Sequence, residues 1–175
     1  MRSLLALAEL AKDVPAVSCK THDFDVARIR LGNFIVAKAN EICRVNNISY
    51  EESEDAPESF EGIIKGFADA VMNLKPFYVS SVGCDETVYI APYINWAFRF
   101  WHDYLHFKHN LTLSFIDELM VSNIHVHEVE LEFGVNSLEA KIMQIDTAAQ
   151  AMYYQIHKDF VVDQLEFCKA MIQKY

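Results

Sequence analysis

The sequence predicts an all-α protein, a single helical domain of about six or seven helices over residues 1–175. Apolar residues recur at intervals of three and four along most of the chain, which is the spacing of one helix face. Only 5 glycines and 4 prolines occur in 175 residues, which favours long helices over a turn-rich β fold. Pro76, Asn110 and Gly134 fall where apolar patterns end. Hydrophobic residues make up 52% of the chain, which favours a packed core over disorder.

Residues 1–20 are expected to form an N-terminal arm with a short helix over 3–13. Charged residues interrupt its apolar run, so we interpret the segment as an amphipathic helix rather than a cleaved leader. Asp23 or Asp25 is a suitable cap for the second helix. Apolar residues at helical intervals carry that helix to about Val45.

An acidic loop over 48–58 separates this helix from the next, which Ser59 opens and Pro76 closes. After it, residues 77–90 contain two strand-like runs on either side of Gly83. These runs predict either a small β-hairpin or a plain connecting loop.

The second half of the chain predicts four helices. Pro92 fits the first turn of a central helix. Thr112 or Ser114 starts the next helix, which runs to Phe133. A capping pattern that begins at Asn136 opens the third, and a last helix ends the chain.

The charge of the chain restricts its partners. The formal net charge is −10, and no cluster of lysine and arginine is dense enough to neutralise nucleic-acid phosphates. Nucleic acid is therefore not an expected partner. The acidic residues 50–58 are a candidate contact for a basic protein partner, although a solvated loop is the simpler interpretation. The oligomeric state stays open.

The cysteines and the hydropathy indicate a compartment. Cys19, Cys43, Cys84 and Cys168 show neither zinc-finger nor C-x-x-C spacing. A reducing, cytoplasmic location is therefore expected, in the host cell if the protein is phage-encoded. No apolar run reaches the roughly 18 residues that a membrane span needs, so no membrane association is expected.

Residues 95–109 carry the clearest chemistry. On a helix, Arg99, His102 and His106 share one face, because residues three and four apart are neighbours. Histidines four apart present two imidazoles to one point, as metal ligands do. A set of hydrogen-bonded structural histidines is an equally good interpretation. His109 continues the same stripe, so the sequence leaves open whether His106 or His109 is the second site histidine.

Two later helices carry polar stripes that could meet the first. Glu118 and His125 lie two turns apart on one helix face, with Ser122 between them. Asp146 and Gln150 lie one turn apart among small residues. A surface stripe and a buried hydrogen bond, respectively, are the alternative interpretations. Convergence of the three stripes would supply five metal ligands: His102, His106, Glu118, His125 and Asp146.

Asp103, Arg99 and Gln150 are the candidate catalytic residues around such a metal. Asp103 would orient a ligand histidine or accept a proton. Arg99 would hold an anionic group of the substrate, and Gln150 would position substrate or water. Histidine and carboxylate ligands suit zinc, manganese or iron, and the sequence does not choose between them.

The order of these motifs carries a resemblance. The motifs are Phe98-Arg99-x-x-His102-Asp103-Tyr104-x-His106, then Glu118 followed by His125, then Asp146-x-x-x-Gln150. Together they resemble an uncharacterised family of bacteriophage-encoded proteins. The family has a glycine before its second histidine and a glutamate where this chain has Asp146. The resemblance covers residues 98–150 and implies a phage origin and a polar site, but no activity.

A fainter resemblance is to helical di-iron oxidases of the haem-oxygenase-like type. It depends on the spacing of Glu118 and His125, which matches one ligand pair of those enzymes. The His-x-x-x-Asp-x-x-His element of their third ligand helix is missing from this chain.

The sequence thus predicts a metal-dependent helical enzyme of phage origin, with hydrolysis of an anionic or small-molecule substrate as the leading reaction. A bound metal would make that hydrolysis feasible by lowering the pKa of a coordinated water toward about 7. A non-catalytic phage protein, either a virion component or an inhibitor of a host protein, is the alternative from another class. A di-iron oxidase is the third hypothesis.

Overall fold

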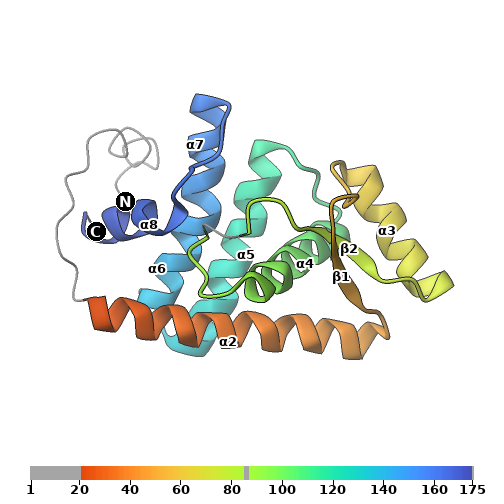
Figure 1. The fold of residues 1–175 in the computed structure, drawn as a ribbon, viewed down its shortest axis with the longest axis horizontal. Helices are drawn as coiled ribbons and strands as arrows, with labels where there is room; N and C mark the ends of the chain where they lie inside the picture. The colour runs from red at the N-terminus through yellow and green to blue at the C-terminus, as the bar shows by residue number, and fades with distance from the viewer. Residues whose placement is uncertain (1–20, 85–86, 175) are drawn as a thin grey trace. The chain divides into compact units, whose positions relative to one another are not determined.

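The computed structural model describes residues 21–84 and 87–174 and is predominantly helical (Figure 1). This confirms the predicted all-α class, and the number of helices is close to the six or seven expected. The helix predicted over 3–13 lies outside the described residues. The elements are α2 (Thr21–Asn46), β1 (Tyr50–Ser53), α3 (Phe60–Asn73), β2 (Phe77–Ser80), α4 (Pro92–His109), α5 (Phe115–Phe133), α6 (Leu138–Gln144), the π-helix η1 (Ile145–Ala149), α7 (Gln150–His157) and α8 (Gln164–Ile172).

The chain divides into two compact units. Unit 1 takes the described residues of 1–31, 86–88 and 115–175, and unit 2 takes those of 32–85 and 89–114. The boundary therefore falls within helix α2, which contributes residues to both. That the whole chain forms one domain stays a prediction. None of the described helices combines the length and the apolar character that crossing a membrane requires.

Unit 2 is built on stacked aromatic rings. Phe67 of α3 stacks on Phe77 of β2 with ring centroids 4.0 Å apart. Tyr50 of β1 stacks on Phe100 of α4 at 4.5 Å. Such pairs contribute about 0.5–1.5 kcal/mol beyond the burial of their area. They hold the small sheet against α3 and α4.

The sheet corrects two predictions. Strands β1 and β2 pair in parallel, with Tyr50 opposite Phe77. The hairpin, one of the two alternatives predicted for 77–90, is wrong, because β2 pairs with β1 and residues 87–90 form bends. The acidic stretch 48–58 is not a loop throughout, since β1 lies within it. Helix α3 makes the crossover that a parallel pair requires, so β1, α3 and β2 form a βαβ motif within unit 2.

Unit 1 contains α5 to α8. Helices α6, η1 and α7 follow one another without a break from Leu138 to His157, with a π-helical turn at Ile145–Ala149. The cap of α6 differs from the prediction by one residue. Ser137 rather than Asn136 accepts a hydrogen bond, from the Ala140 amide at 3.2 Å.

Candidate functional site

Helix α4 positions the central histidines. Pro92 occupies its first turn, and Asn110 ends it in the left-handed conformation with φ 53°. Trp101 and Leu105 are buried in the core. Because they anchor one side of the helix, the face that carries His102 and His106 has a defined direction.

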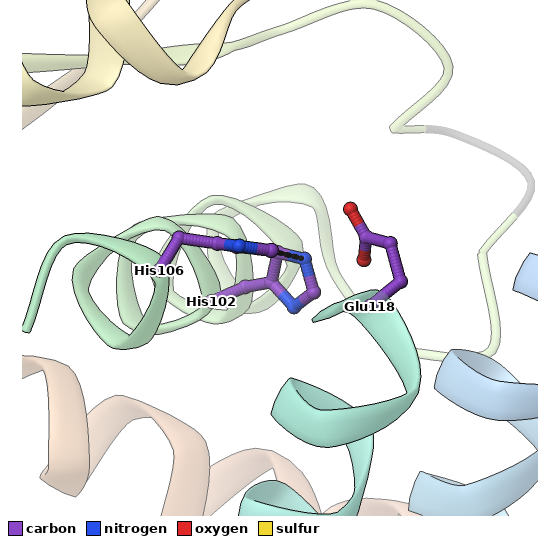
Figure 2. A group of neighbouring side chains, drawn as sticks. All are labelled: His102, His106 and Glu118. Atoms are coloured by element: carbon purple, nitrogen blue, oxygen red, sulfur yellow. Dashed lines mark hydrogen bonds between the residues drawn. The ribbon is translucent and has the colours of Figure 1, made fainter. Parts of the chain in front are cut away.

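The two imidazoles meet as their spacing predicts. The Nε2 atoms of His102 and His106 lie 3.0 Å apart. His106 is fully buried and His102 is half-buried. Figure 2 draws this pair and the hydrogen bond between the rings, together with Glu118, which belongs to unit 1.

The segment after α4 determines where the proton on His106 sits. Nδ1 of His106 lies 3.0 Å from the carbonyl oxygen of Leu111. A carbonyl only accepts, so Nδ1 carries the hydrogen and donates it. The Leu111 amide in turn donates to the His106 carbonyl at 3.0 Å. Leu111 therefore holds His106 by both its backbone and its ring.

This arrangement leaves a lone pair on Nε2 of His106. In a neutral imidazole one nitrogen donates and the other accepts, so a proton on Nδ1 makes Nε2 the acceptor. His102 donates to it through its own Nε2. Metal-ligating histidines commonly donate their other ring N–H to a carbonyl or carboxylate, as His106 does to Leu111.

The structure distinguishes His106 from His109. His109 is exposed at the last residue of α4, whereas His106 is the buried partner of His102. The second histidine of the candidate site is therefore His106.

Arg99 has backbone partners. Its Nη1 donates to the Ser80 carbonyl at 2.6 Å and its Nη2 to the Val82 carbonyl at 2.8 Å. The sequence predicts that Arg99 holds an anionic group of the substrate. In the structure its guanidinium ties α4 to the end of β2.

A buried contact nearby escaped the sequence analysis. Nδ2 of Asn95 donates to Sγ of Cys84 at 3.3 Å, and both residues are buried. The available signal was the position of Asn95, two turns before His102 on the same helix face. Nothing in the sequence indicated that Cys84 would be its partner.

Unit 1 carries the other predicted site residues. Glu118 lies in the first turn of α5, where the helix dipole favours a carboxylate. Ser122 and His125 are buried further along the same helix. Asp146 is 9% exposed and accepts a hydrogen bond from Gln150 at 2.9 Å.

A second buried hydrogen bond joins α5 to the π-helix. The hydroxyl oxygens of Ser122 and Thr147 lie 2.6 Å apart. Thr147 donates its only hydroxyl hydrogen to the Met143 carbonyl at 2.7 Å. Ser122 must therefore donate to Thr147. Ser122 belongs to the predicted polar stripe with Glu118 and His125, but nothing in the sequence indicates Thr147 as its partner.

Cys168 of α8 is also buried in unit 1. Burial raises the pKa of its thiol well above the ordinary value, and the negative charge of Asp146 raises it further, against a smaller opposing effect of Arg28. The thiol is thus protonated at neutral pH and is a poor nucleophile.

The described residues of unit 1 form no metal centre of their own. Among its described residues, no three histidine, cysteine, aspartate or glutamate side chains bring ligand atoms close enough to share an ion. Glu118, His125 and Asp146 therefore do not form such a group by themselves.

No protein-family model, curated protein or solved structure matches this chain.

Proposed function

We propose that the protein is a metal-dependent enzyme in which His102, His106 and Glu118 hold one divalent cation. Two imidazoles and one carboxylate form the ligand set of several catalytic zinc sites, in which a water takes the fourth position. Zinc, manganese and iron all suit these ligands.

The observation that carries the proposal is the geometry of the two histidines. Ligand nitrogens about 2.1 Å from a tetrahedral zinc lie about 3.4 Å from each other. The Nε2 atoms of His102 and His106 are 3.0 Å apart, so a small opening of the pair would admit an ion. The Leu111 carbonyl supports this role, because it keeps the lone pair of His106 on Nε2.

Glu118 is the third ligand of the proposal on grounds of residue type and position. It opens α5 as a carboxylate, and the sequence analysis assigned it to the same site. His125 and Asp146 are left out, because they contribute to no group of three ligand atoms among the described residues.

Hydrolysis is the reaction that suits this site best. A cation with an open position lowers the pKa of its bound water toward about 7, which makes hydroxide available near neutral pH. Asp103, beside His102 on α4, is our candidate for the group that accepts the proton. The cation itself would attract an anionic substrate, since both Nη atoms of Arg99 donate to backbone carbonyls.

Metal analysis tests this proposal directly. We expect the purified protein, incubated with Zn²⁺ or Mn²⁺ and then desalted, to retain close to one ion per chain. His102→Ala should abolish retention, because one of two imidazoles is lost. Glu118→Gln should weaken binding by at least about 10–100-fold, because even the loss of a residue that only supports a metal ligand costs that much.

His109→Ala is the matched control, since His109 is an exposed histidine of the same helix. It should leave the metal content unchanged. Retention of a full equivalent by His102→Ala, or no retention by the wild-type protein, would contradict the proposal.

A non-catalytic binding protein is the second candidate. The observation in its favour is that the buried polar side chains of Ser122, Thr147, Asn95 and Cys84 have partners within the protein. The acidic residues 50–58 would then contact a protein partner. A virion component or an inhibitor of a host protein, in the host cytoplasm, fits the resemblance to the phage family. This candidate predicts no metal and a normally folded His102→Ala variant.

A di-iron oxidase has less support. A di-iron centre in a helical bundle uses about six side-chain ligands. The described residues contain no group of histidine and carboxylate ligands that large.

A further inference from the structure

The backbone hydrogen bonds of the small sheet determine which groups of β1 point outward. The Ser81 amide donates to the Ser53 carbonyl at 3.2 Å, so Ser53 faces β2. Backbone groups of successive strand residues alternate between the two edges. Tyr50 and Glu52 therefore present their N–H and C=O groups to the outer edge of β1.

Among the described residues, only one of the two outer edges of this sheet has hydrogen-bond partners. On the β2 side, the guanidinium of Arg99 donates hydrogen bonds to the carbonyl of Ser80, the last residue of the strand, and to that of Val82, just beyond it. On β1, no further strand pairs with the outer edge within the part of the chain that the structure describes, and Glu51 and Glu52 are exposed. Two-stranded parallel sheets seldom stand alone, and an open edge is a template for another strand.

Strand β1 is held in place before any partner arrives. Its first residue, Tyr50, stacks on the buried ring of Phe100. Just before it, Ile48 is buried and its amide donates to the Cys43 carbonyl at 3.1 Å. A strand that is already ordered loses little entropy on pairing, which favours binding.

The charge around this edge selects the partner. Between residues 51 and 61 the chain has six carboxylates and no lysine or arginine. All six side chains are exposed, and none forms an ion pair with another described residue. They are Glu51, Glu52, Glu54, Asp55, Glu58 and Glu61. A second copy of this chain would bring the same charges and be repelled, whereas a basic segment would be attracted.

We propose that the outer edge of β1 binds an extended, basic segment of a partner protein as a third strand. Main-chain hydrogen bonds to Tyr50 and Glu52 supply the pairing, and the surrounding carboxylates supply the preference for lysine and arginine. This inference does not depend on the proposed metal, and it gives the second candidate function a defined mode of contact.

Binding of synthetic peptides to the full-length protein tests the proposal. The probe is a fluorescently labelled ten-residue peptide in which lysine alternates with valine. One control peptide has glutamate in place of lysine, and another keeps the lysines but carries N-methyl groups on alternate amides. Fluorescence anisotropy should show binding of the first peptide only, and the affinity should fall as salt is added.

Two substitutions at one position separate the backbone from the charge. Glu52→Pro removes the outward N–H without removing a hydrogen bond to β2, because the Glu52 amide faces away from that strand. Glu52→Gln removes one charge and keeps the N–H. We expect Glu52→Pro to weaken binding of the lysine peptide at least about tenfold and Glu52→Gln no more than about threefold.

Several results would overturn the proposal. They are equal affinity of the two Glu52 variants, equal binding of the lysine and glutamate peptides, and no binding of any peptide. A dimer of the wild-type chain that Glu52→Pro dissociates would show that the edge serves a second copy instead. If Glu52→Pro fails to fold, the N-methylated peptide decides the question with the wild-type protein.

Discussion

At the scale of single residues, the backbone carbonyl of Leu111 determines which nitrogen of His106 carries the hydrogen. By accepting from Nδ1, its carbonyl keeps the basic lone pair of His106 on the nitrogen that faces His102. The reversal of the chain that brings Leu111 back to His106 passes through Asn110 at φ 53°. Asn110 is exposed and is not one of the proposed ligands, yet it positions the ligand nitrogen through the backbone. We therefore regard it as a positioning residue.

Substitution of Asn110 tests this role. A β-branched residue is strained at positive φ, so Asn110→Val should displace the Leu111 carbonyl. We expect Zn²⁺ affinity, measured by calorimetry, to fall about tenfold in this variant. Asn110→Gly tolerates the same φ and should bind as the wild-type protein does. Equal affinity of the two variants would show that Leu111 does not control His106.

At the scale of secondary-structure elements, the π-helical turn brings a threonine to α5. The turn Ile145–Ala149 is inserted between α6 and α7, and its Thr147 accepts from Ser122. A π-helical turn widens the helix and is often found at functional sites. Here it supports a buried hydroxyl pair and also contains Asp146, a predicted ligand.

A double-mutant cycle measures this link. Thr147→Val removes the acceptor and leaves the buried Ser122 hydroxyl without a partner, which should cost about 1–3 kcal/mol in the free energy of unfolding. Adding Ser122→Ala removes the stranded donor, so the double variant should regain part of that loss. Unfolding in urea gives the four values. Strictly additive losses would mean that the two hydroxyls do not interact in solution.

At the scale of the whole molecule, the proposed ligands come from both units. His102 and His106 belong to unit 2, and Glu118 belongs to unit 1. A single ion bound by all three would stabilise the folded chain in a metal-dependent way. A structural hydrogen-bond network would have no such dependence on metal.

Thermal unfolding with and without metal tests this stabilisation. A ligand at 100 times its Kd stabilises the folded state by about 2.7 kcal/mol. We expect Zn²⁺ at that excess to raise the Tm of the wild-type protein and EDTA to reverse the change. In Glu118→Gln the increase should be smaller, and in His102→Ala it should disappear. An equal increase in His102→Ala would show that zinc binds elsewhere.

The sequence alone determined the features that depend on local geometry. Helical spacing predicted the all-α class and the meeting of His102 with His106, because residues four apart on a helix are always neighbours. It also predicted the cap at Ser59, whose hydroxyl accepts from the Gly62 amide. These features need no knowledge of the rest of the chain.

Only the tertiary structure decided the features that join distant segments. Strand β1 pairs with β2 across helix α3, and neither strand carries a sign of the other in its own residues. Arg99 meets the carbonyl of Ser80, which is a backbone group and leaves no signature in the sequence. The sequence did not predict the π-helical turn, because a single widened turn leaves the spacing of apolar residues almost unchanged. Contacts between residues a few positions apart follow from the local sequence, whereas contacts between residues far apart in the sequence depend on how the elements pack.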